Sequence, residues 1–107
     1  MREELQEYQE GLLWKVEEDQ SLTIGVTQSA IDMVGAIQGV EITDVGDEFE
    51  AGDWIGEIQG KDGLVEILAP CRIRVTERNK EILGQPAMVE DDPTGDAWIV
   101  RVEKLDD

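Results

Sequence analysis

The sequence predicts a mostly β fold, a small barrel or sandwich that forms one compact domain. Short segments in which apolar and polar residues alternate recur along the 107 residues, and turn-forming residues, among them 11 glycines, separate these segments. No linker-like stretch divides the chain. Hydrophobic residues make up 40% of the sequence, which suits a globular chain with a small core. Together these features are typical of a small β barrel or sandwich with two or three short helices.

The N-terminal part of the chain is expected to begin with a peripheral element. Residues 2–10 are good helix formers with few apolar anchors, and Gly11 ends them. We therefore predict a helix or arm over residues 1–11 and a single domain over residues 12–107. Within that domain, residues 12–16 and 22–26 are expected to form a hairpin.

A short helix should follow this hairpin. Thr27 has the chemistry of a helix N-cap, and Gly35 has that of a C-terminal stop. Between them Ala30, Ile31 and Val34 fall on one helical face. A second short helix is expected within residues 79–89.

The remaining elements are short strands and turns, and Ala69-Pro70 should end one of the strands because proline cannot continue a central ladder. The predicted strands lie at residues 36–43, 54–59, 64–68, 72–75 and 97–105. The predicted turns lie at residues 44–47, 51–53, 60–63 and 92–95.

The strand patterns also predict a core, in which each member is an apolar residue on the presumed inner face of its segment. These residues are Trp14, Ile24, Val26, Trp54, Ile58, Val65, Ile67, Trp98 and Val100. Between the two central turns, Phe49 is expected to face inward.

The negative charge of the chain limits the kinds of molecule that it can bind. Its 26 acidic and 9 basic residues give a formal net charge of −17, which repels nucleic acid and anionic membranes and favours basic protein surfaces. No apolar run approaches membrane-spanning length, and the N-terminus has no signal-peptide core. We expect a cytoplasmic monomer.

Few residues offer catalytic or metal chemistry. There is no histidine, so Cys71, the only cysteine, has no histidine to activate it and is expected to be a buried structural thiol. Acidic residues 90–92 and 106–107 could hold a hard cation, but their spacing is not that of a calcium loop. Solvated acidic turns are the better interpretation, and we predict neither an enzyme nor a metal site.

The predicted hairpin of residues 54–68 has a lysine at its tip. Gly60 and Gly63 bracket Lys61 and Asp62, so a two-residue loop would place the Lys61 amine in full contact with solvent. Two interpretations are open. An enzyme could acylate this amine to make a swinging arm, or Lys61 and Asp62 could simply be polar turn residues.

Several stretches, in order, resemble the glycine cleavage system H-protein family over nearly the whole chain. These are LLWKV, TIGVTQSAIDMVG, GVEITDVGDEFEAGD, GEIQGKDGLVEILAP and VEDDPTGDAWIVRV. The resemblance implies a barrel-sandwich hybrid fold like that of lipoyl domains. It also implies a carrier in which lipoate, bound by an amide to the hairpin lysine, carries the aminomethyl group left by glycine decarboxylation. The implied partners are glycine decarboxylase, aminomethyltransferase, dihydrolipoamide dehydrogenase and a lipoate ligase.

The hairpin departs from the family pattern at its tip. The family typically reads Glu-Ser-Val-Lys-Ala, and a gapless match puts Asp62 at the acceptor position and Lys61 one residue before it. Gly63 replaces the usual alanine. Either the turn is re-registered and Lys61 is the lipoyl attachment site, or the chain is an unlipoylated paralogue that acts as an interaction or regulatory protein. A biotin carrier would need a lysine between methionines, which Lys61 lacks.

Overall fold

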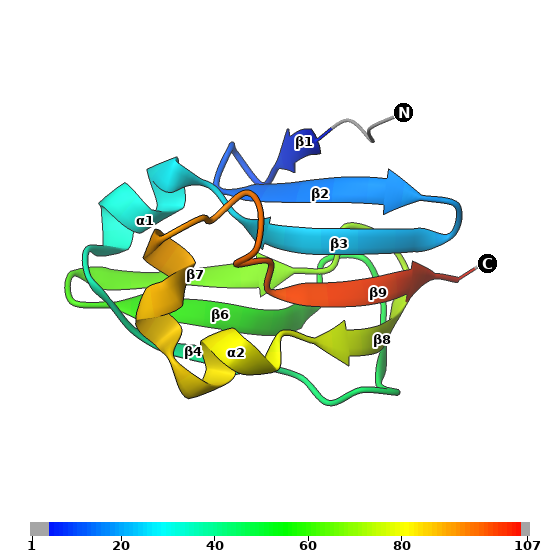
Figure 1. Cartoon of the computed structure of the whole chain (residues 1–107). Coiled ribbons are helices and arrows are strands. Elements are labelled where there is room, and N and C mark those ends of the chain that lie inside the picture. The colour runs from blue at the N-terminus through cyan, green and yellow to red at the C-terminus, as the bar shows by residue number, and fades with distance from the viewer. Residues whose placement is uncertain (1–4, 106–107) are drawn as a thin grey trace.

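The computed structural model describes residues 5–105 and contains two antiparallel sheets with short helices at their ends (Figure 1). One sheet has six strands in the order β1-β2-β3-β9-β8-β5, and the other has three in the order β4-β6-β7. The elements are β1 (Leu5–Tyr8), β2 (Leu13–Glu18), β3 (Ser21–Val26), α1 (Gln28–Val34), β4 (Ile37–Ile42), β5 (Glu48–Phe49), β6 (Trp54–Gly60), β7 (Gly63–Leu68), β8 (Ile73–Arg78), α2 (Lys80–Gly84), the 3-10 helix η1 (Pro86–Glu90) and β9 (Val100–Lys104).

The mostly β architecture predicted from the sequence is confirmed, and so are its main local elements. The β2–β3 and β6–β7 hairpins form at the predicted places. Helix α1 begins after Thr27, whose hydroxyl accepts the N–H of Ala30 and donates to the carbonyl of Gly11 at 2.7 Å. The helix ends at Gly35, which has a positive φ of 76° that glycine adopts without strain.

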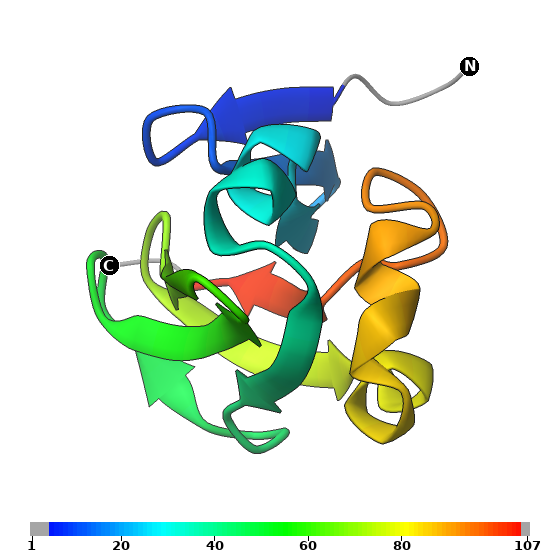
Figure 2. The ribbon, with the colours of Figure 1, turned by 90° about the vertical axis from the view of Figure 1, so that its left-hand side faces the viewer.

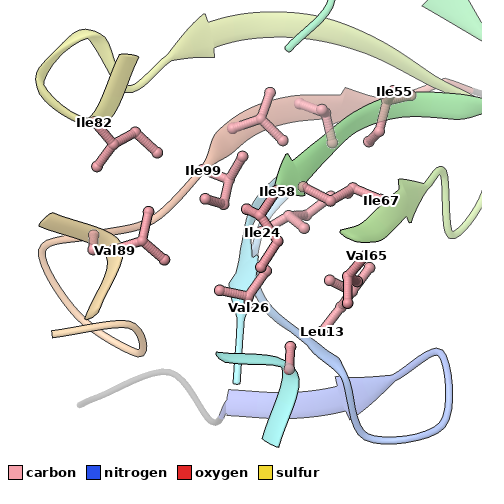
Figure 3. Close-up of a cluster of buried hydrophobic side chains, with 14 of the residues drawn as sticks. Leu13, Ile24, Val26, Ile55, Ile58, Val65, Ile67, Ile82, Val89 and Ile99 are labelled. Carbon is pink, nitrogen blue, oxygen red and sulfur yellow. The ribbon is translucent and has the colours of Figure 1, made fainter. Parts of the chain in front are cut away.

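The core lies between the two sheets, where side chains from both point toward one another (Figure 3). Leu13, Ile24, Val26, Ile55, Ile58, Ile67 and Ile99 are fully buried there, and Ile82 of α2 and Val89 of η1 close the cluster at one end. Burying most of the branched apolar side chains in this way supplies most of the stabilisation of a domain this small. Of the predicted core residues, Trp14, Ile24, Val26, Ile58, Val65, Ile67 and Val100 are buried as expected.

Trp54 and Trp98 are only half-buried, so their placement in the core was wrong. In β6 the register shifts between Trp54 and Gly56, and this irregularity turns Ile55 inward in place of Trp54. Trp98 precedes β9 and lies beneath the guanidinium of Arg101, whose carbon is 4.2 Å from the ring centroid.

For residues 1–11 a helix or an arm was predicted, and the helical alternative is wrong where the structure describes the segment. Leu5–Tyr8 is the strand β1, which pairs with β2 in a register that places Leu5 opposite Val16. Helix propensity is a weak preference, and pairing with an existing sheet edge outweighs it here. Residues 1–4 of the predicted helix lie outside the described part of the chain.

The chain after β1 closes the free edge of the β4-β6-β7 sheet. The side-chain amide of Gln9 donates to the carbonyl of Glu66 and accepts the N–H of Leu68 at 3.2 Å, and the Tyr8 hydroxyl donates to the carbonyl of Leu68 at 3.3 Å. These groups pair with the edge of β7 as a neighbouring strand would. The β6–β7 hairpin is therefore fixed to the rest of the domain near its base.

Candidate functional site

The β6–β7 hairpin ends in a two-residue loop with Lys61 and Asp62 at its tip, as the sequence predicted. Gly60 and Gly63 form the last cross-strand pair, and both loop residues are exposed. The loop lies at the same end of the molecule as α1, the end that faces the viewer in Figure 2.

The tip is bonded to the chain that leaves α1. The N–H of Lys61 donates to the carbonyl of Ala36 at 2.9 Å, and the N–H of Asp62 donates to the carbonyl of Val34 at 2.7 Å. Neither loop residue has a positive φ. The favoured two-residue hairpin loops require a positive φ at their first position, so the contact with α1, rather than local turn chemistry, holds this loop in shape.

Gly60 and Gly35 allow the hairpin tip to approach the end of α1 closely. A Cβ on Gly60 would overlap the carbonyl oxygen of Val34, and a Cβ on Gly35 would lie 2.6 Å from a carboxylate oxygen of Asp62. By contrast, a Cβ on Gly63 would meet nothing within 4 Å. The hairpin therefore packs its Gly60 side against α1 and leaves its Gly63 side open.

The two tip side chains differ in their surroundings. The Asp62 carboxylate lies against Gly35, whereas no hydrogen bond or ion pair within residues 5–105 engages the Lys61 ammonium. Lys61 is thus an accessible amine on a fixed hairpin. The sequence located this lysine but gave no sign that the end of α1 would hold it.

Behind the tip, three glutamates form a row across the outer face of the three-stranded sheet. Glu57 of β6 lies between Glu41 of β4 and Glu66 of β7 in the strand register. Like charges placed directly opposite one another repel. The Gln59 amide partly offsets this repulsion by donating to Glu41 at 3.1 Å and to Glu57 at 2.7 Å. This row gives the outer face of the three-stranded sheet an acidic character that the sequence analysis did not localise.

Cys71 and the acidic residues 90–92, the other groups considered from the sequence, make contacts within the fold. Cys71 is half-buried at the margin of the core rather than fully buried, because it sits in the loop between β7 and β8. Burial raises the pKa of the neighbouring Tyr8 hydroxyl, and Cys71 adds to that rise. Glu90 accepts the N–H of Ile37 at 3.1 Å, and Asp92 accepts the N–H of Asp96 at 3.1 Å. Within residues 5–105 no three acidic or cysteine side chains gather as metal ligands, and residues 106–107 lie outside the described range.

Comparison with known proteins identifies the family that the sequence matches and the fold that the structure shares. The sequence profile of the family described as "Glycine cleavage H-protein" matches residues 4–107. A solved glycine cleavage system H protein from Mycobacterium marinum superposes with a TM-score of 0.87, covers 97% of this chain and 86% of its own, and is 22% identical. The fold is therefore that of H-proteins.

Curated relatives agree with this assignment. The glycine cleavage system H protein of Clavibacter sepedonicus is 36% identical over 83% of this chain and 72% of its own length. Those of Trichormus variabilis and Staphylococcus haemolyticus are 36% and 35% identical, over 78% and 88% of this chain and 65% and 75% of their own lengths. The chain thus spans about two thirds to three quarters of the relatives it matches.

The two-sheet fold is the barrel-sandwich type seen in H-proteins, and the family match makes the chain a carrier-type protein. The chain belongs to the glycine cleavage H-protein family. No helix in residues 5–105 combines the length and apolar character needed to cross a membrane.

Proposed function

We propose that this protein is a lipoyl carrier of the glycine-cleavage type and that lipoate is attached through an amide to the Nζ of Lys61. The observation that carries the proposal is the exposed Lys61 amine at the apex of a hairpin held against α1, in a chain of the H-protein family.

The residues at the tip fit such a group. Amide formation needs an accessible amine, and no side chain within the described residues binds that of Lys61. When bound, the dithiolane of lipoate supplies the sulfur that carries an aminomethyl group between enzymes. The chain itself presents and orients the arm: Ile58 and Val65, a cross-strand pair behind the tip, are buried in the core, and Gln9 closes the edge of the hairpin.

The partners follow from this role. A lipoate ligase would modify Lys61, and glycine decarboxylase, aminomethyltransferase and dihydrolipoamide dehydrogenase would each receive the arm. We expect partners with basic surfaces, because the net charge is −17 and Glu41, Glu57 and Glu66 form an acidic row. Electrostatic attraction between such surfaces raises the rate of association. We propose that the protein works in the cytoplasm as a monomer.

A second function is favoured by one specific residue. In a gapless match to the family pattern Asp62 falls at the acceptor position, and a ligase that recognises the geometry of the turn would then meet a carboxylate there. In this alternative the protein is an unlipoylated member of the family that binds partners as an interaction or regulatory protein.

A lipoylation assay separates the two functions. The protein is incubated with lipoate, ATP and a lipoate ligase, and its intact mass is compared with those of Lys61→Arg and of the double variant Lys61→Val, Asp62→Lys. Arginine keeps the charge but forms no amide under these conditions, so it should abolish modification without affecting the fold. The double variant restores both tip residues of the family pattern and therefore shows whether a lysine at position 62 can be the acceptor on this fold.

The outcomes are distinct. Modification of the parent that is lost in Lys61→Arg supports the carrier. An unmodified parent together with a modified double variant supports the unlipoylated alternative, because the ligase is then active on this fold but rejects the native tip.

A further inference from the structure

We propose that the carboxyl end of α1, the segment Val34–Ala36, is a positioning element that fixes the register of the hairpin tip and presents Lys61, rather than residue 62, to a modifying enzyme. This inference rests on the proposed lipoylation of Lys61 and names the residues that determine which position is modified.

The first support is that the tip is tied to this segment at both loop residues. The carbonyls of Ala36 and Val34 accept the N–H groups of Lys61 and Asp62 at 2.9 and 2.7 Å. A slip of the loop by one residue would break both bonds and would reverse the faces of the flanking side chains. The segment therefore holds the tip in one register.

The second support is that the fit depends on glycine at the points of contact. Gly60 lies so close to Val34 that any side chain there would displace the hairpin from α1. Gly35 leaves the space in which the Asp62 carboxylate lies, and its φ of 76° is one that glycine favours. These contacts orient the side chain of residue 62 toward α1.

The consequence concerns specificity at the tip. The backbone is held and the Asp62 side chain lies against Gly35, whereas no hydrogen bond or ion pair within residues 5–105 engages the exposed Lys61 ammonium. The segment Val34–Ala36 thus compensates for the one-residue offset between Lys61 and the acceptor position of the family. It acts through the hairpin backbone and does not touch the reacting amine.

The matched pair Gly60→Ala and Gly63→Ala tests this. The two glycines face one another across the hairpin, yet an added Cβ at 60 meets Val34 and one at 63 meets open space. Amide hydrogen exchange, read by NMR, measures whether the Lys61 and Asp62 N–H groups stay bonded, and it needs no lipoate. We expect Gly60→Ala to raise exchange at both amides by at least about tenfold and Gly63→Ala to leave it near the parent value. Unchanged protection in a folded Gly60→Ala variant would overturn the proposal.

A second variant guards against misfolding of Gly60→Ala. Gly35→Ala introduces a clash with the Asp62 carboxylate, and the additional change Asp62→Ala removes that clash while it leaves the φ strain in place. Tip exchange should rise in Gly35→Ala and return toward the parent value in the double variant. An identical rise in both would contradict the contact as we describe it.

To test the positioning role, the rate of lipoylation of Lys61 is measured for each variant at the same concentration of folded protein. Misplacement of a reacting group by about 1 Å can cost about a hundredfold in rate, so Gly60→Ala should lose at least about tenfold in kcat/KM while Gly63→Ala does not. Raised exchange at the tip with unchanged lipoylation would overturn the positioning role. If the parent is not lipoylated at all, the proposed function fails, whereas the exchange experiment still decides whether α1 holds the tip.

Discussion

Two hairpins of this domain end in two-residue loops, and they reach their shapes in different ways. The β2–β3 loop, Asp19 and Gln20, follows the cross-strand pair of Glu18 and Ser21, and Asp19 takes a left-handed φ of 56°. The β6–β7 loop follows the pair of Gly60 and Gly63, and neither of its central residues has a positive φ. Its N–H groups are bonded to the end of α1 instead.

The difference shows how the candidate site depends on the rest of the fold. A left-handed residue provides the twist that a tight hairpin needs, so the β2–β3 loop is specified largely by its own residues. The β6–β7 loop is shaped by tertiary contact, so changes in α1 should reach Lys61 and should not reach Asp19. The first two predictions below concern the hairpin that carries Lys61, and the last two compare the two loops directly.

The largest effect is expected at the buried pair of the β6–β7 hairpin behind the tip, Ile58 and Val65. Ile58 is fully buried, so Ile58→Ala should lower the free energy of unfolding by about 2–5 kcal/mol. Leu64 on the neighbouring strand is 54% exposed, and Leu64→Ala should change it by less than about 0.5 kcal/mol. Denaturant unfolding measures both, and equal losses would contradict the assigned faces of the hairpin.

The attachment of β1 to the base of the same hairpin should produce a dependence on alkaline pH. Burial, with a contribution from Cys71, raises the pKa of Tyr8 in the folded state, so the folded state holds this proton more tightly than the unfolded chain does. This contribution is present in full below the unfolded pKa of about 10 and is lost as the pH rises toward the folded value, at up to about 1.4 kcal/mol per pH unit. Urea unfolding between pH 9 and about 11 should show this decline, and Tyr8→Phe should flatten it. The same slope in both proteins would show that Tyr8 is not its source.

Weakening α1 should disturb one loop and spare the other. Thr27→Ala removes the N-cap of α1 and the bond to Gly11, and should cost about 0.5–2 kcal/mol. Amide exchange should rise at Lys61 and Asp62 and stay unchanged at Gln20. Thr27→Ser, which keeps the hydroxyl, is the matched control. Faster exchange at both loops would mean that the variant loosens the whole domain.

The smallest effect is expected from glycine at the first loop positions. Asp19→Gly relieves a left-handed conformation and should raise the free energy of unfolding by up to about 0.5–1 kcal/mol. Lys61→Gly relieves nothing and adds entropy to the unfolded chain, so it should lower the free energy of unfolding by a similar amount. Thermal unfolding of the two variants should shift in opposite directions, and shifts of the same sign would contradict the contrast between the loops.

The sequence alone predicted most of the fold because its local signals agree with the tertiary structure. The alternation in Leu22, Ile24 and Val26 and the cap at Thr27 both point to the elements that form. The sequence-based predictions were wrong where contacts between distant parts of the chain determine the local structure. Trp54 leaves the core because of a register shift that only strand pairing reveals, and residues 5–8 become a strand because the edge of β2 is available.

The candidate site was predictable in position but not in the way it is held. Gly60 and Gly63 around Lys61 and Asp62 indicated the hairpin tip from local turn chemistry. The contact with Val34 and Ala36 joins segments 25 or more residues apart, and in the sequence Gly35 reads only as a helix stop. The row formed by Glu41, Glu57 and Glu66 likewise requires the strand register and could not be separated from the general acidity of the chain.

The central claim is that Lys61 carries lipoate, and the most direct test is the mass of the protein purified from its own cells. The account predicts an intact mass that exceeds the sequence mass by one lipoyl group, with peptide fragmentation placing that group on Lys61. Other lipoyl proteins from the same cells show whether lipoate was available. If those proteins are modified while this chain is found only at its sequence mass, the account is contradicted and the unlipoylated alternative takes its place.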